Sequence, residues 1–349
     1  MARLGALIPS YRMAAETFTE LVGLSVASAT TEEVTTVAGQ RLRDIEMAIS
    51  KANAALPGTG EECPLGVGSE HPALPEPDHL CVSLDGVMVN TDEGWREVKV
   101  VSVSEVEERE QPAKDEAPVI LVNHGYQAGF WETKEFADVQ WNEAQSRGVE
   151  RANRVTSVND GAPWVWALVL LCYPTALQVV DWWHLVERLW KVAGVVFGPG
   201  STEAEVWVKE RKDELWAGNV SAVVNALRKL RSRRKGAQEE IRRLKQYLHT
   251  HGERMRYQEF REQGAPVGSG TVESACKNVV GSRMKRGGMR WKGEGAEGVL
   301  ALRCALLSNR WHEAWDQQRR VASNPLETHA HPPDHLTELA CSHNMVVLY

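Results

Sequence analysis

The pattern of hydrophobic and polar positions divides the chain into segments with different periods. Residues 1–55 carry apolar residues at helical spacing, as in Ala14 to Leu24, and this predicts a helical N-terminal segment. Proline and glycine are frequent over residues 56–78, a composition that favours a linker or a long surface loop. A domain boundary is therefore expected before residue 79.

Residues 79–200 alternate between stretches typical of strands and stretches typical of helices. Five strands are predicted, at 79–85, 98–106, 118–123, 154–160 and 176–181. Helices are predicted at 131–148, from Pro163 onward and from Trp182 to Val192. Because helices are interleaved with the later strands, we predict an α/β protein with a mixed sheet and flanking helices.

The C-terminal half of the chain is dominated by helical patterns. Residues 201–264 are purely helical in pattern and heavily charged, whereas residues 265–320 contain a glycine-rich turn followed by further helix. Residues 321–349 are polar and rich in His and Pro, and we expect a tail there. Residues 79–200 and 265–320 would then form one core, interrupted by a helical segment.

Composition excludes some classes of protein. Of the 349 residues, 43% are hydrophobic and 25% are charged, which is ordinary for a folded protein. No run of about 18 uncharged apolar residues occurs, so we expect no membrane span, and the N-terminus lacks the pattern of a secretory signal. The six cysteines include no close pair, which argues against a zinc ribbon and favours reduced thiols in a cytoplasmic protein.

The charge is distributed unevenly. The whole chain has a formal charge of −7, but residues 221–292 contain 18 Lys and Arg against 6 Asp and Glu, a local charge of +12. A concentrated basic segment in an acidic protein suggests a polyanionic partner, although a solvated helix surface has the same pattern.

Three acidic residues stand where a divalent cation is commonly bound. Asp85 and Asp160 each end a predicted strand and precede a glycine, and Glu273 opens a helix after the Gly268–Thr271 turn. Hard cations such as Mg²⁺ prefer carboxylate oxygens. Asp-Gly pairs are also ordinary turn signals, and a glutamate in a first helical turn is favoured by the helix dipole, so each acid alone proves little.

Basic and aromatic residues follow the third acid, and we predict that they bind DNA. They are Lys277, Arg283, Lys285, Arg286, Arg290 and Trp291. Trp291 is expected either to stack on a base or to lie in the core. Asp181 and His184 are three positions apart on one helix face, where they can bind a metal, orient each other or cap the helix.

Four blocks of this sequence resemble the ISKra-type insertion-sequence transposases, relatives of the Mutator superfamily with an RNase H-like catalytic domain. The blocks are Ser83–Gly86 continued by Gly94–Lys99, Asn159–Trp166, Asp181–His184, and Val267–Trp291. The last block is the most specific, because it combines Gly, Glu, Cys and Trp at fixed spacing over a long stretch. Together they span about residues 80–315.

The resemblance implies a DDE transposase that cleaves DNA and joins strands. Asp85, Asp160 and Glu273 would be the catalytic acids and the ligands of two Mg²⁺ (or Mn²⁺) ions, with Asp181 and His184 in supporting roles. The helical segment 201–264 matches the insertion that such transposases place before the last acid. Double-stranded DNA, both element ends and target, would be the partner of a homo-oligomer associated with a prokaryotic nucleoid.

Some alternatives stay open at this point. Asp181 also follows a predicted strand and is a candidate for the second acid, and Asn159 stands where the family often has glycine. The chain also seems to begin inside the N-terminal region of the family, so residues 1–55 are interpreted as the remnant of a DNA-binding region. The rival functions are a different RNase H-like nuclease and an inactive remnant that only binds DNA.

Overall fold

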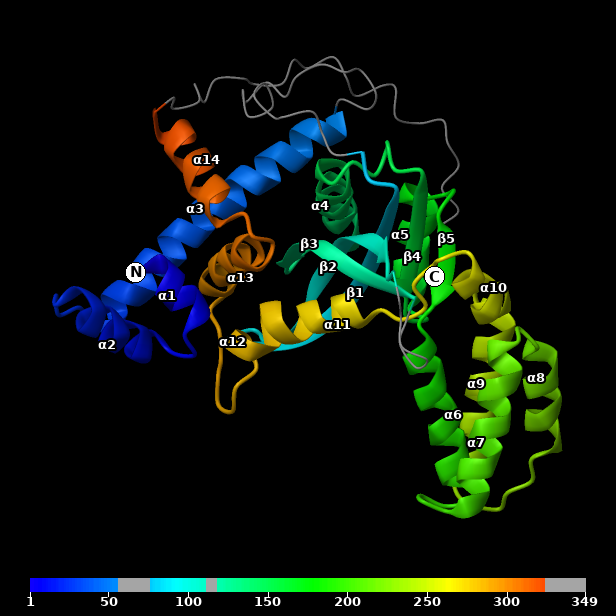
Figure 1. Cartoon of the computed structure of the whole chain (residues 1–349). Coiled ribbons are helices and arrows are strands. Elements are labelled where there is room, and N and C mark those ends of the chain that lie inside the picture. The colour runs from blue at the N-terminus through cyan, green and yellow to red at the C-terminus, as the bar shows by residue number, and fades with distance from the viewer. Residues whose placement is uncertain (56–75, 111–117, 324–349) are drawn as a thin grey trace, which may run out of the picture.

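A single mixed sheet lies at the centre of the computed structural model, which describes residues 1–55, 76–110 and 118–323 (Figure 1). The strands are β1 (His79–Thr91), β2 (Gly94–Glu108), β3 (Val119–Gly129), β4 (Arg154–Asn159) and β5 (Leu177–Val180). Their order across the sheet is β3-β2-β1-β4-β5. The first three strands are antiparallel, and β4 and β5 continue the sheet parallel to β1. This arrangement is compatible with the predicted RNase H-like fold.

The first two strands are longer than the sequence predicted. We expected a strand to end at Asp85, but β1 continues to Thr91, where it turns tightly into β2 at Gly94. The reason is that Val87 and Val89 continue the alternation after Gly86 and pair with the start of β2. The expectation that Asp85 ends a strand is therefore wrong.

The two faces of the sheet are covered by different helices. On one face, apolar residues such as Leu84 and Val101 pack with α4 (Thr133–Ser146), α5 (Pro163–Cys172) and α6 (Trp182–Val196). On the other face, residues such as Val89 and Val100 pack with the helices of the last part of the chain. These are α11 (Gly270–Ala275), the π-helical segment η2 (Cys276–Gly281), α12 (Ser282–Met284) and α13 (Gly293–Leu307).

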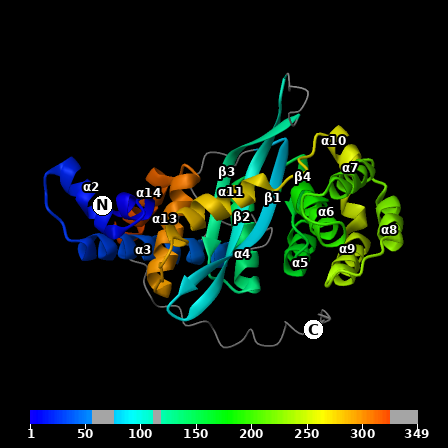
Figure 2. The same cartoon turned by 90° about the horizontal axis from the view of Figure 1, so that it is seen from below.

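Between β5 and α11 the chain forms a helical arm that projects from one side of the sheet (Figures 1 and 2). The arm contains α6, α7 (Thr202–Trp216), α8 (Val220–Lys229), α9 (Ala237–His251), η1 (Gly252–Arg254) and α10 (Tyr257–Glu262). Its base is fixed by Trp182, whose ring lies 5.2 Å from that of Trp216 and 4.8 Å from that of Tyr257. The expected helical character of residues 201–264 agrees with these helices.

The N-terminal helices lie on the opposite side of the sheet from the arm (Figure 2). They are α1 (Ala2–Leu7), α2 (Tyr11–Val22) and α3 (Ser28–Ala55), and α3 packs on α13 and on α14 (Trp311–Ser323). A Cβ atom at Gly39 of α3 would stand 2.1 Å from the carbonyl oxygen of Gly298 in α13, so this close crossing requires glycine. These helices thus share one core with the C-terminal helices.

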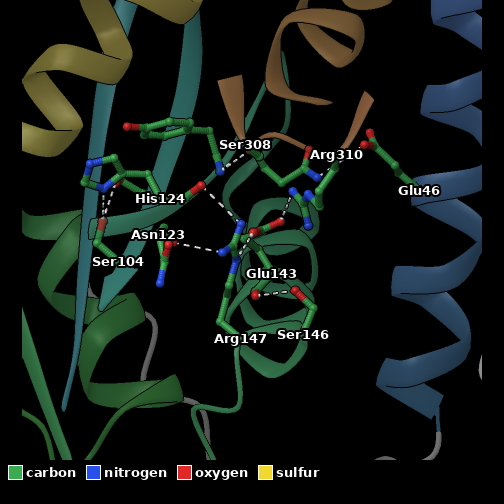
Figure 3. A network of polar contacts seen from close by, with 12 residues as sticks. Glu46, Ser104, Asn123, His124, Glu143, Ser146, Arg147, Ser308 and Arg310 are labelled. Carbon is green, nitrogen blue, oxygen red and sulfur yellow. Dashed lines mark hydrogen bonds and ion pairs between the residues drawn. The ribbon is translucent and has the colours of Figure 1, made fainter. Parts of the chain in front are cut away.

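A buried polar network joins β3, α4 and the start of α14 (Figure 3). The Glu143 side chain is 1% exposed and lies 3.3 Å from Arg147 Nε and 2.7 Å from Arg310 Nη2. Arg147 also donates to the backbone carbonyls of Asn123 and His124, at 2.8 and 3.1 Å. One carboxylate therefore fixes two arginines from different segments.

Among the described residues, no helix is both long and apolar enough to cross a membrane. Most of the predicted linker and of the predicted tail, at residues 56–75 and 324–349, lies outside the described residues.

Candidate active site

Asp85 lies in the middle of β1 and faces the helices that follow the arm. It shares a strand face with Val87 and Val89, which pack toward α11 and η2. Its Oδ1 accepts the backbone N–H of Gly86 at 2.7 Å, and its Oδ2 accepts the thiol of Cys276 at 3.3 Å. Burial raises the pKa of Asp85, these two hydrogen bonds oppose the rise, and the charge of Asp160 adds to it.

Asp160 directly follows β4, as the sequence predicted. Extending the parallel register that pairs Val82 with Ser157 places Asp160 alongside Asp85. Its Oδ1 accepts the backbone N–H of Ala162 at 2.8 Å, and this turn leads into α5. The Asp160 carboxylate is half-buried.

Asn159, the last residue of β4, connects β4 to β1 next to these two acids. Its side chain is fully buried, and its Oδ1 accepts the backbone N–H of Leu84 at 2.6 Å. Its amide donates to Ser157 Oγ at 2.8 Å. Because Leu84 directly precedes Asp85, this side chain fixes the spacing between the two acids.

Asp181 is fully buried and its oxygens are occupied by donors of the protein. It is the N-cap of α6, where Oδ1 accepts the backbone N–H of His184 at 2.7 Å. Its Oδ2 accepts the backbone N–H of Ser269, in the turn before α11. Although burial acts to raise it, hydrogen bonds from His184 and Ser269 hold the pKa of Asp181 below its usual value.

His184 joins Asp181 to Glu273. Its Nδ1 lies 3.2 Å from Asp181 Oδ1 and 3.5 Å from Glu273 Oε1. The hydrogen bond with Asp181 raises the pKa of His184 to about 9, against the effect of burial. At neutral pH the ring is therefore a cation between two carboxylates, and a protonated ring has no lone pair for a metal.

Glu273 lies in the first turn of α11, with its side chain about half exposed. Burial of the remainder raises the pKa of Glu273, the charge of Asp181 adds to the rise, and His184 opposes it. Asp85 acts on Glu273 in the same direction as Asp181. The structure thus brings Asp85 and Asp160 together on the sheet, and it brings Glu273 to Asp181 and His184 beside them.

Two arrangements of these side chains are suited to a cation. Asp181, His184 and Glu273 each offer one possible ligand atom, and these three atoms lie within 4.8 Å of one another. That group suits a metal only after His184 loses its proton. Asp85, Asp160 and Glu273 are not within this distance of one another in the described residues, but their donor chemistry, carboxylate oxygens alone, is the kind that Mg²⁺ or Mn²⁺ prefers.

Two of the residues predicted to contact DNA are buried: the prediction is wrong for Arg283, and for Trp291 the structure shows the alternative, a place in the core. Arg283 is 2% exposed and donates to the backbone carbonyls of Gly5 and Pro9, both at 3.1 Å. Trp291 is 8% exposed, and its Nε1 donates to Met284 O at 3.3 Å. The basic stretch therefore has one face against the core. On this face Arg283 is hydrogen-bonded to the N-terminal segment, and Trp291 is hydrogen-bonded to α12.

The other predicted DNA-binding residues lie at the surface. Arg290 is exposed, but its guanidinium donates to the backbone carbonyls of Thr91 and Asp92, so it supports the β1–β2 turn. Lys277, Lys285 and Arg286 are exposed. Three of the six predicted residues therefore remain free to face a polyanion.

The sequence analysis missed three residues beside the acids. Cys276 donates to Asp85, and burial raises the pKa of its thiol, so it is a neutral donor. Asn159 fixes the strand spacing, and Trp183 is 60% exposed beside Gly268. The only signal for them was position, since each is adjacent to or three residues from a predicted site residue.

Comparisons with known proteins do not assign a family. No family model matches the chain, and no curated protein matches it. Among solved structures, the Drosophila P element transposase strand transfer complex is similar over 82% of this chain and 84% of that chain, with 9% identity and a TM-score of 0.23. Since a TM-score this low does not establish a common fold, the functional argument rests on the site.

Proposed function

We propose that this protein is a DDE transposase that cleaves DNA and transfers strands through metal-dependent phosphoryl transfer. The proposal rests on two links: the register of β1 and β4 places Asp160 alongside Asp85, and the charge of Asp85 acts on Glu273 of α11. The resemblance to ISKra-type transposases supports the same three residues.

Asp85, Asp160 and Glu273 would hold one or two Mg²⁺ or Mn²⁺ ions, which when bound activate a water or a 3′-hydroxyl and stabilise the leaving oxygen. The carboxylates themselves must be ionised to do this. In the metal-free chain the pKa values of Asp85 and Glu273 are raised, so protons compete with a metal ion for these carboxylates. Metal affinity is therefore expected to rise with pH through the acid range.

Asp181 is assigned a positioning role and Asp160 the role of second acid. Both oxygens of Asp181 are directed at donors of α6 and of the turn before α11, so it fixes these two segments relative to each other. His184 then orients Glu273 by ion pairing. Asp85 also accepts a hydrogen bond at each oxygen, but one donor is the weak thiol donor of Cys276, and Asp85 and Asp160 are half-buried whereas Asp181 is fully buried.

The proposed partner is double-stranded DNA, both element ends and target. We further propose a homo-oligomer on DNA and a cytoplasmic location at the nucleoid, in line with the resemblance.

The proposal predicts that Asp85→Asn, Asp160→Asn and Glu273→Gln each reduce strand cleavage by at least ~1,000-fold, because each removes a charge that binds metal. Binding of the same DNA is expected to stay within a few-fold of the wild-type chain. The measurement is a gel assay on a labelled element end with Mg²⁺, with Asp213→Asn as the control, since Asp213 is exposed on α7 outside the site.

The product separates this proposal from its rivals. Cut and joined strands support a transposase, whereas cut strands alone indicate another RNase H-like nuclease. Bound but intact DNA indicates a remnant without activity. If Asp181→Asn abolishes cleavage in a chain of unchanged stability while Asp160→Asn is active, the assignment of the second acid is wrong.

A further inference from the structure

A short loop at the far end of the arm carries a dense positive charge. Residues 228–235, here named the tip loop, read Arg-Lys-Leu-Arg-Ser-Arg-Arg-Lys, with six basic residues and no acid. The six basic side chains are exposed. The tip loop joins α8 to α9 at the end of the arm opposite the sheet (Figure 1).

The charge of the tip loop is not neutralised by the fold. Arg231 donates to the backbone carbonyls of Arg228 and Leu230, and Arg228 donates to the amide oxygen of Asn225. In the described part of the chain, no ion pair links any of its six basic residues to a carboxylate. The neighbouring Arg242 and Arg243 of α9, by contrast, both pair with Glu239, at 2.9 and 2.8 Å.

Helix α6 connects the acids to the tip loop. Asp181 caps its start, and a Cβ atom placed at Gly198, just after its end, would stand 3.0 Å from Arg234 Nη1. The 15 residues of α6 span about 22 Å at ~1.5 Å per residue. The acids and the tip loop are therefore at opposite ends of one rigid element.

The exposed side of α6 offers apolar contact but little net charge. Trp183 and Trp190 are 60% and 43% exposed. The exposed charges between and beside them are Glu187, Arg188 and Lys191, and Arg188 lies over the ring of Tyr247. Lys191 pairs with Glu240 at 3.1 Å. The attraction for a polyanion is accordingly concentrated in the tip loop.

We propose that the tip loop is a second DNA-binding site, which holds backbone phosphates of the duplex beside the cleavage point, at a distance set by α6. With ~3.4 Å of duplex per base pair, 22 Å corresponds to about six or seven base pairs. This inference rests on the proposed function, because the distance is counted from the cleavage point. Exposed arginines and lysines without acidic partners bind phosphates independently of sequence.

The test compares two triple variants of equal charge change, both in the Asp85→Asn background. Arg231→Glu, Arg233→Glu and Lys235→Glu reverse the tip loop. Arg12→Glu, Arg41→Glu and Lys51→Glu reverse exposed residues of the N-terminal helices. Binding is measured by fluorescence anisotropy at several salt concentrations. The duplexes carry the cleavage point with flanks of either 4 or 12 base pairs.

The tip variant is expected to bind the 12-base-pair flanks at least ~10-fold more weakly, with a log–log salt slope flatter by up to about 2.7, if each residue contacts one phosphate. On duplexes with 4-base-pair flanks, the affinity of the tip variant should equal that of the parent. The affinity of the control variant should equal that of the parent on both flank lengths. The neutral variant with Gln at positions 231, 233 and 235 should show the same length dependence.

Three results would overturn the proposal. Equal loss on both flank lengths would indicate general attraction, unchanged affinity would exclude the site, and a larger loss on single-stranded DNA or RNA would exclude duplex as its ligand. The proposed function can fail separately. If the wild-type chain does not cut DNA but the tip variant still loses affinity only on the long flanks, the proposed transposase function is refuted and the tip loop remains a phosphate-binding site.

Discussion

The side chains of the candidate site differ in how firmly the fold holds them. Asp181 is fully buried and surrounded by backbone donors, and its pKa is lowered. Glu273 is half exposed, and its pKa is raised by burial and by neighbouring acids. A carboxylate that is stable as an anion suits a positioning role, whereas repulsion between acids is relieved when a cation binds.

His184 is expected to make stability depend on pH in the absence of metal. Its pKa in the folded chain is about 9, against 6.5 for an ordinary histidine, so the protonated ring stabilises the fold. This contribution is fully present below pH 6.5 and is lost as pH rises to about 9. Urea denaturation in EDTA should show that the free energy of unfolding falls as pH rises across this range. The fall should be smaller in His184→Gln.

If the free energy of unfolding depends on pH equally in the wild-type chain and in His184→Gln, then His184 gains no proton affinity on folding. Because the ring is more than a third exposed, solvent screening keeps the expected effect modest. Lys277→Gln is the matched control, since Lys277 is exposed on η2.

At this scale the sequence was informative about some residues and misleading about others. Asp160 was predictable, because an apolar run that ends in Asp-Gly before a helix marks the end of a buried strand. Asp85 has the same Asp-Gly signal, but hairpin pairing with β2 carries the strand past it. Arg283 was misjudged and Trp291 was left open, because a run of basic residues does not reveal which side chains contact the core.

At the scale of elements, the order of strands and helices was predictable and their contacts were not. All five strands and the helices between them were expected from periodicity, whereas the register of β1 depends on the partner strand. The ion network around Glu143 also had no sequence signal, because Arg310 comes from a segment 167 positions away.

Glu143→Ala should lower the free energy of unfolding by about 3 kcal/mol or more, because it leaves Arg147 and Arg310 buried without their carboxylate. Glu143→Gln should lower it less, since an amide oxygen still accepts a hydrogen bond. The measurement is urea denaturation followed by circular dichroism.

Arg242→Ala is the reference variant, because it removes an exposed ion pair and should leave the free energy of unfolding nearly unchanged. A Glu143→Ala chain as stable as this reference would show that the buried network does not hold β3, α4 and α14 together.

At the scale of the whole molecule, the N-terminal helices are part of the core. Arg303 of α13 donates to Ala6 O and to Val279 O, both at 2.6 Å, and Arg283 donates to Gly5 O. Whatever the ancestry of residues 1–55, they complete the packing around the helices that follow Glu273.

Deletion of residues 1–55 is therefore expected to abolish folding rather than to remove DNA recognition alone. The deletion would expose the apolar face of α13 and leave buried arginines without acceptors. Size-exclusion chromatography and thermal melting provide the measurement. The control, Leu21→Ser with Leu24→Ser, changes only residues that are 73% and 64% exposed and should melt like the parent. A deleted chain that is monomeric and melts cooperatively would contradict this account.

The crossing of Gly39 with Gly298 also has a consequence for synthesis on the ribosome. The two glycines are separated by 259 positions, so α3 emerges long before the helix on which it packs. At ~5–20 residues per second, the interval is about 13–50 seconds. During that time the side of α3 that packs on α13 has no native partner, although α1, α2 and α4 already contact the helix, and the nascent chain is exposed to aggregation and to chaperones. Any message that ends before the codons of α13 would then yield a polypeptide destined for degradation.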